Sequence, residues 1–92
     1  MIYVDNMRAE FGRMRMCHMI ADTHEELMEI ADKLRLDRRW IQKRGKPDEH
    51  FDVCLSHRRT AVQLGAIEVD SRKLVEIIQR KRSHPHKEEG TK

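Results

Sequence analysis

The sequence predicts an α/β domain in which a small, mostly parallel β-sheet is covered by about three helices. Two observations lead to this expectation. Apolar, β-forming runs alternate with helical segments along the second half of the chain, which favours crossover connections between parallel strands. The run at residues 16–21 is apolar on both faces apart from His18, as is typical of a strand with helices above and below it.

The strands are indicated by apolar runs that end at turn-forming residues. The first run ends at Asp5 and Asn6, and a loop containing Gly12 separates it from the second. Strands are expected at residues 1–5, 16–21, 51–55 and 66–69. Asp5 is therefore expected at the carboxyl end of the first strand.

Capping residues mark the three helices. Thr23 and Glu26 form a capping box, and an apolar stripe follows at helical spacing: Leu27, Ile30, Ala31 and Leu34. The second helix is expected to begin after Ser56 and to stop at Gly65. The third is expected to be capped by Ser71 and ends in basic residues, which suits the helix dipole.

The chain of 92 residues is short enough for one domain, which we place at residues 1–82. Residues 83–92 contain Pro85, two histidines and charged residues, with nothing apolar to bury, so they are predicted to form a disordered basic tail.

Composition points to the cytoplasm and to no membrane partner. No apolar stretch approaches the roughly 20 residues that span a bilayer, and the start lacks a signal-peptide pattern. The two cysteines, Cys17 and Cys54, lie in apolar runs and are interpreted as buried free thiols. The net charge of +3 permits binding to nucleic acid or to a phosphorylated small molecule but does not select either.

Five polar residues occupy positions that suggest a site: Asp5, His18, Asp22, His50 and Asp52. In an open α/β sheet, ligands bind beyond the carboxyl ends of strands, where Asp5 is expected. Side chains two residues apart on a strand share a face. His18 is therefore expected on the face of Asp22, and His50 on the face of Asp52.

This set suits two kinds of chemistry. All five residues are candidates for acid–base catalysis, and Asp5, His18, His50 and Asp52 are candidate ligands for a divalent metal such as zinc, manganese or iron. The simpler alternative is structural. Asp5 and Asp22 then cap turns after strands, and His18 is a core histidine hydrogen-bonded to Asp22.

Three arginines are candidate phosphate ligands, because a guanidinium offers planar, paired donors: Arg38, Arg39 and Arg58. The alternative is a solvated charged face. Trp40, beside Arg39, is expected to cap the core, with base stacking as the alternative function.

A series of motifs runs along the chain: Ile2-Tyr3-Val4-Asp5, Cys17-His18-Met19-Ile20-Ala21-Asp22, Arg38-Arg39-Trp40 and His50-Phe51-Asp52-Val53. It resembles the domain of unknown function 4031 family, a group of short phage and bacterial proteins, over about residues 2 to 80. The resemblance implies a phage or bacterial cytoplasmic protein but no established activity. It also implies that the family's recurring polar positions include Asp5, His18, Asp22, Arg38, Arg39, His50 and Asp52.

These observations leave three functional hypotheses. The first is a protein that binds a phosphate-bearing ligand, either a nucleotide or a nucleic-acid end, with metal-assisted hydrolysis. The second is a non-enzymatic phage accessory protein that binds or inhibits a host protein. The third is a nucleic-acid-binding module. The first predicts that the five polar residues converge in one cleft. The second predicts that they scatter or satisfy one another, with an exposed apolar patch elsewhere. The third predicts one continuous positive face and steep salt dependence.

Overall fold

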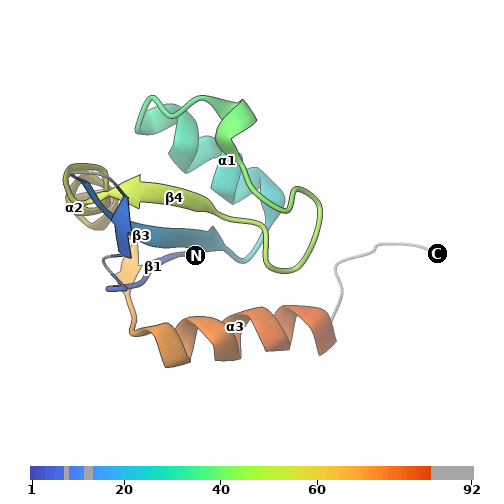
Figure 1. The fold of residues 1–92 in the computed structure, drawn as a ribbon. Helices are drawn as coiled ribbons and strands as arrows, with labels where there is room; N and C mark the ends of the chain where they lie inside the picture. Colours follow the sequence, from blue (N-terminus) through green and yellow to red (C-terminus); the bar gives the residue numbers. More distant parts are fainter. Residues whose placement is uncertain (8, 12–13, 84–92) are drawn as a thin grey trace.

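The computed structural model describes residues 1–7, 9–11 and 14–83, which form a β-sheet with helices on both faces (Figure 1). The strands are β1 (Ile2–Val4), β2 (Ala9–Phe11), β3 (Met14–Ala21), β4 (Phe51–Cys54) and β5 (Ile67–Glu68). β3 is the long central strand. β1 and β2 pair with one of its edges and β4 with the other, while β5 pairs with β1.

The sheet is mixed, so the prediction of a mostly parallel sheet is wrong. Among the described strands only β1 and β5 pair in parallel, and the other three pairs are antiparallel. β4 and β5 do run in the same direction, as the alternation of strand and helix predicts, but β3 and β1 lie between them. The link from β1 to β3, residues 5–13, is too short for a helical crossover, so β3 returns antiparallel.

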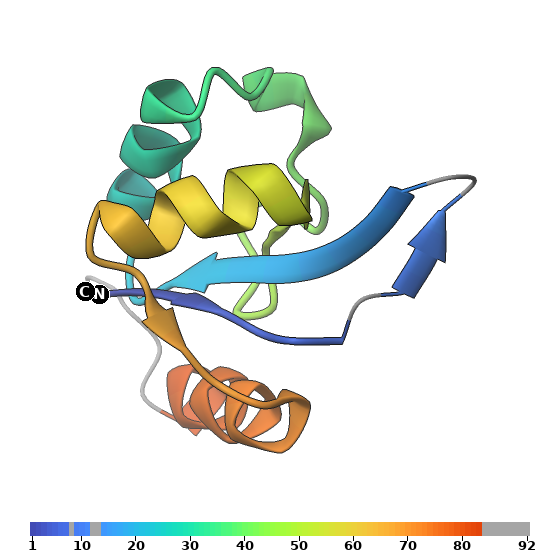
Figure 2. The same ribbon diagram turned by 90° about the vertical axis from the view of Figure 1, so that its left-hand side faces the viewer.

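Three α-helices and one short 3-10 helix complete the fold: α1 (His24–Lys33), η1 (Arg38–Trp40), α2 (Leu55–Gln63) and α3 (Ser71–Ser83). α1 and α2 cover one face of the sheet, and α3 lies against the other (Figures 1 and 2). Thr23 caps α1 as predicted, since its hydroxyl accepts from the backbone N–H of Glu26 at 3.2 Å.

The larger core lies between the sheet and the pair α1 and α2. Met19, Val53 and Leu27 are fully buried in it. A smaller core joins the opposite face to α3, with Tyr3 and Ile20 packed against Leu74 and Ile77. Because side chains alternate along a strand, the residues of β3 and β4 that do not enter the larger core point to the α3 side.

Several further expectations are wrong in part. β2 forms in a segment predicted to be a loop, and Cys54 stands at the N-cap of α2 in place of Ser56. Cys17 is buried as predicted, but Cys54 is partly exposed. Trp40 does not cap the core, because 61% of its surface is exposed.

The predicted tail lies outside the described residues except for Ser83, the last residue of α3. Within the described part of the chain, no helix has the length and apolar character needed to cross a membrane.

Candidate metal centre

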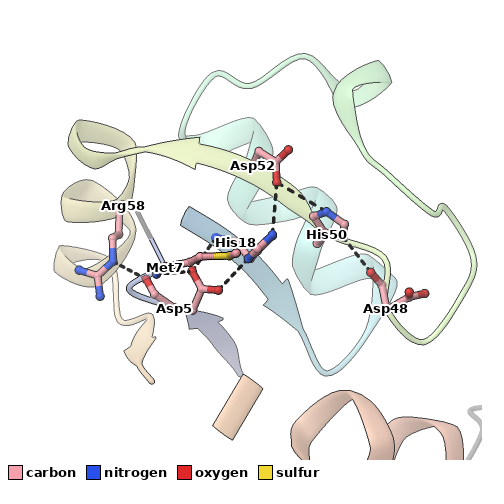
Figure 3. A network of polar contacts seen from close by, with 7 residues as sticks. All are labelled: Asp5, Met7, His18, Asp48, His50, Asp52 and Arg58. Carbon is pink, nitrogen blue, oxygen red and sulfur yellow. Dashed lines mark hydrogen bonds and ion pairs between the residues drawn. The ribbon is translucent and has the colours of Figure 1, made fainter. Parts of the chain in front are cut away.

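Two histidines and an aspartate meet on the sheet face that carries α3 (Figure 3). His18 on β3 lies directly opposite Asp52 on β4 in the antiparallel register. The neighbours of both residues enter the larger core, so their own side chains point to the opposite face. His50 stands two residues before Asp52 and shares that face. Strand alternation and register therefore bring the three side chains together. We use the name metal centre for His18, His50 and Asp52 because they could together hold a metal ion.

The nitrogen and oxygen atoms of the metal centre surround a common point. Oδ1 of Asp52 lies 3.6 Å from Nε2 of His50 and 3.9 Å from Nε2 of His18. All three candidate ligand atoms lie within 4.8 Å of one another. These separations are too long for hydrogen bonds. Metal bonds of about 2.0–2.1 Å at tetrahedral angles place ligand atoms roughly 3.3 Å apart, so the three atoms would have to draw closer together to bind one ion.

Asp5 orients His18 from behind. Its carboxylate is buried at the end of β1, and Oδ2 lies 2.7 Å from Nδ1 of His18. Oδ1 accepts the backbone N–H groups of His18 at 2.8 Å and Met7 at 3.3 Å. Asp5, which the sequence groups with the metal ligands, therefore lies on the far side of the ring. Carboxylates commonly hold a ligating histidine in this way.

The Asp5–His18 contact shifts the pKa of both partners. Burial is the largest influence on Asp5 and acts to raise its pKa. Hydrogen bonds from the ring and backbone of His18 together outweigh burial and leave that pKa below its ordinary value. The hydrogen bond to Asp5 is the largest influence on His18 and raises its pKa, although burial opposes it. Asp5 is thus ionised at neutral pH, and Nδ1 of His18 carries the proton that it donates.

His50 is held by a backbone group instead. Its Nδ1 lies 2.9 Å from the carbonyl oxygen of Asp48, which is only an acceptor, so Nδ1 must carry the proton (Figure 3). In the neutral form both imidazoles then present the lone pair of Nε2 toward Oδ1 of Asp52. Three acceptors directed at one point repel one another unless a proton or a metal ion supplies positive charge there.

The segment that carries His50 is anchored to α1. Glu49 is buried, and its Oε1 lies 2.9 Å from Nδ1 of His24 and accepts the backbone N–H of Gly45 at 3.0 Å. Gly45 has a φ of +80°, a conformation that favours glycine. These contacts fix the path of the backbone before β4 and therefore the position of His50.

Asp22 is the predicted site residue that the structure leaves outside the cluster. It follows the carboxyl end of β3, where its carboxylate accepts the hydroxyl of Tyr3 at 3.3 Å and lies 3.4 Å from the N-terminal ammonium of Met1. It is not the partner of His18, because that place is taken by Asp5.

The three predicted phosphate ligands are engaged within the chain. Arg38 makes a paired contact with Asp32, and Arg39 with Asp37. Arg58 donates to the backbone carbonyl of Asp5 at 2.7 Å and to Glu68 at 2.9 Å. Figure 3 shows its guanidinium on the side of Asp5 away from His50. Arg58 therefore ties α2 to the ends of β1 and β5 and does not face the metal centre.

Sequence reasoning missed two contacts of the metal centre. One is the carbonyl of Asp48, which no side-chain pattern reveals. The other is Gln42, whose side chain donates to Asp52. Gln42 lies outside the strands and helices that the sequence predicts, and its pairing with His50 depends on the path of the chain before β4.

Comparison with known proteins places the chain in a family. The family model described as "Protein of unknown function (DUF4031)" matches residues 2–81. No curated protein and no solved structure matches the chain. The matched range contains all five strands, α1, α2 and all but the last two residues of α3, and with them every residue of the metal centre. The chain therefore belongs to the DUF4031 family.

Proposed function

We propose that this protein holds a divalent transition-metal ion at His18, His50 and Asp52 and uses it to bind and hydrolyse a phosphate-bearing ligand of the nucleotide or nucleic-acid class. The observation that carries the proposal is the convergence of two Nε2 atoms and one carboxylate oxygen at distances longer than hydrogen bonds. A small domain tolerates facing acceptors at a partly exposed site most readily when a cation offsets their repulsion.

The ligand set favours a zinc-like ion. Two neutral imidazoles and one carboxylate are a common set for zinc and for iron or manganese, whereas magnesium and calcium prefer oxygen ligands. Three protein ligands leave at least one position for water or substrate. A metal in such a site lowers the pKa of bound water toward neutrality and polarises a phosphoryl oxygen. Hydrolysis then adds water across a P–O bond and releases a phosphate and an alcohol.

A basic segment next to the metal centre supports the phosphate-bearing class of ligand. We call residues 38–46 the basic loop, which leads along the chain to His50 and Asp52. Arg44 and Lys46 are exposed and make no ion pair within the described part of the chain, in contrast to Arg38 and Arg39. Trp40 is exposed on the same loop, where an indole ring offers a stacking surface for a base.

The test begins with calorimetric titration of zinc into the metal-free protein. One ion per chain is expected to bind, and His50→Ala and Asp52→Asn should each abolish or strongly weaken binding. His57→Ala is the matched control, because His57 lies on α2 and outside the cluster. His18 is left intact, since its removal would leave Asp5 without its partner and confuse binding with folding.

Activity is tested on the zinc- and manganese-loaded protein with a nucleotide that carries a chromogenic phosphate ester. Release of the chromophore by the wild type, and its loss in Asp52→Asn, supports hydrolysis. Metal binding without any release would overturn the hydrolytic part and leave a metal-dependent binding protein. Failure to bind metal would overturn the whole proposal in favour of a non-enzymatic accessory protein.

A further inference from the structure

Gln42 is joined to the metal centre by both its backbone and its side chain. Its backbone forms an isolated antiparallel bridge with His50, with Gln42 N–H donating to the His50 carbonyl at 2.8 Å and His50 N–H donating back at 3.1 Å. Its side-chain amide donates from Nε2 to Oδ2 of Asp52 at 2.5 Å. The donor must be the NH₂ group, because an ionised carboxylate only accepts.

The two oxygens of the Asp52 carboxylate have different neighbours. Oδ2 is occupied by the amide of Gln42, whereas Oδ1 is the oxygen that faces His18 and His50. A carboxylate held in this way offers a metal one oxygen. Rotation to offer both oxygens would break the hydrogen bond to Gln42, whose backbone is already fixed by its bridge to His50.

The number of oxygens offered bears on the choice of metal. Zinc is commonly four-coordinate, with one oxygen from each carboxylate, whereas larger or harder ions take more oxygen ligands, often from a bidentate carboxylate. The geometry points to Gln42 as a positioning residue that keeps Asp52 a one-oxygen ligand and thereby favours four-coordinate zinc over manganese. This inference rests on the proposed metal site.

The experiment compares the wild type with Gln42→Met, which keeps the length of the side chain but removes the donor. Gln63→Met is the matched control, because Gln63 is an exposed glutamine on α2 with no contact to Asp52. Zinc and manganese affinities are measured by calorimetry. The visible spectrum of the cobalt(II) form reports coordination number, since four-coordinate cobalt absorbs far more strongly than six-coordinate cobalt.

In Gln42→Met we expect zinc affinity to fall about 10–100-fold, in the range seen when a partner of a metal ligand is removed. Manganese affinity should change less, so the ratio of zinc affinity to manganese affinity should be smaller than in the wild type. The cobalt spectrum should weaken toward that of a higher coordination number. Gln42→Arg, which restores a donor toward Asp52, should recover part of the wild-type spectrum, whereas a role limited to folding would leave the spectrum of the folded fraction unchanged.

Three outcomes would overturn the inference. A Gln42→Met protein with wild-type affinities and spectrum would remove any role for Gln42 while leaving the metal site intact. Equal loss of both metals without a spectral change would indicate loosened structure instead of altered coordination. A wild type that binds neither metal would overturn the proposed site and this inference together. If Gln42→Met does not fold, Gln42→Asn, whose amide is one methylene short of Asp52, replaces it with the same expected results.

Discussion

The side chain of Asp5 is buried at the end of β1 and accepts hydrogen bonds on both carboxylate oxygens. An asparagine at this position keeps one acceptor but turns an NH₂ group toward a neighbouring N–H donor. Because buried donors without partners are costly, we expect Asp5→Asn to lower the free energy of unfolding of the metal-free protein by about 1–3 kcal/mol. It should also weaken zinc binding, since His18 loses the group that orients it.

Chemical denaturation of Asp5→Asn and of Asp22→Asn checks this expectation. Asp22 contacts Tyr3 and the N-terminus at a partly exposed position, so its replacement should cost less than about 1 kcal/mol. An Asp5→Asn protein as stable as the wild type would show that the carboxylate is not needed for folding.

The same pair of residues predicts how the stability of the metal-free protein depends on pH. The pKa of His18 is raised, chiefly by its hydrogen bond to Asp5, so its protonated form is favoured in the folded state. This contribution is complete below the unfolded pKa of about 6.5 and is lost as the pH rises through the higher folded value. The lowered pKa of Asp5 adds stability above its unfolded value, which is lost in strong acid as the pH falls through the folded value.

We therefore expect the free energy of unfolding, measured with a chelator present, to be greatest at mildly acidic pH and to fall as the pH rises from about 6.5 through the raised folded pKa of His18. His18→Gln should lack the part of that fall due to His18. A wild type whose stability is flat or rises over this range would contradict the expected ionisation of the pair.

At the scale of elements, α1 shows which sequence signals are dependable. Leu27 is fully buried and Ile30 nearly so, on the stripe that the sequence predicts. Truncation of either residue to alanine should lower the free energy of unfolding by about 2–5 kcal/mol, because it removes buried apolar surface and leaves a cavity. Glu29→Ala, on the exposed side of the same helix, is the control and should cost well under 1 kcal/mol. Urea denaturation measures all three.

The sequence predicts α1 and β3 well because a capping box, a period of 3.6 and an apolar run are local signals. It also groups Asp5, His18, Asp22, His50 and Asp52, from strand alternation and from the end of the first strand, and the structure leaves only Asp22 outside the contacts of this group. Strand order is not local, so the insertion of β3 and β1 between β4 and β5 could not be predicted.

The arginines illustrate a second limit of sequence interpretation. Arg38 and Arg39 resemble free phosphate ligands in the sequence, yet each pairs with an aspartate. Arg39 pairs with Asp37, two residues earlier, and Arg38 pairs with Asp32 across the turn after α1. The pairing of Arg38 depends on the direction of that turn, which has Arg35 at a φ of +61°.

For the molecule as a whole, the metal centre joins segments that are distant in the chain, since His18 comes from β3 and His50 and Asp52 from the region of β4. An ion that binds only the folded state stabilises it in proportion to the logarithm of its concentration, by about 2.7 kcal/mol at 100 times the Kd. For a domain of this size, that corresponds to a rise in Tm of roughly 10 °C or more.

Thermal melts with zinc and with an added chelator check this prediction. The rise should disappear when the chelator is added and should be absent in Asp52→Asn. A zinc-induced rise of equal size in Asp52→Asn would place the stabilising ion elsewhere on the molecule.

Where β3 pairs with β4, each strand has an apolar face in the larger core and a side chain of the metal centre on the other face, and this difference favours the correct register between the two strands. A slip of one residue along either strand would turn its side chains over, because the side-chain period is two. His18 or Asp52 would then be forced against Leu27 and the rest of the larger core, while Val53 or Cys17 would face water. A buried polar group without a partner costs several kcal/mol, more than most small domains could lose and remain folded. The polar side chains of the metal centre thus disfavour misaligned pairing of β3 with β4, whether or not an ion is bound.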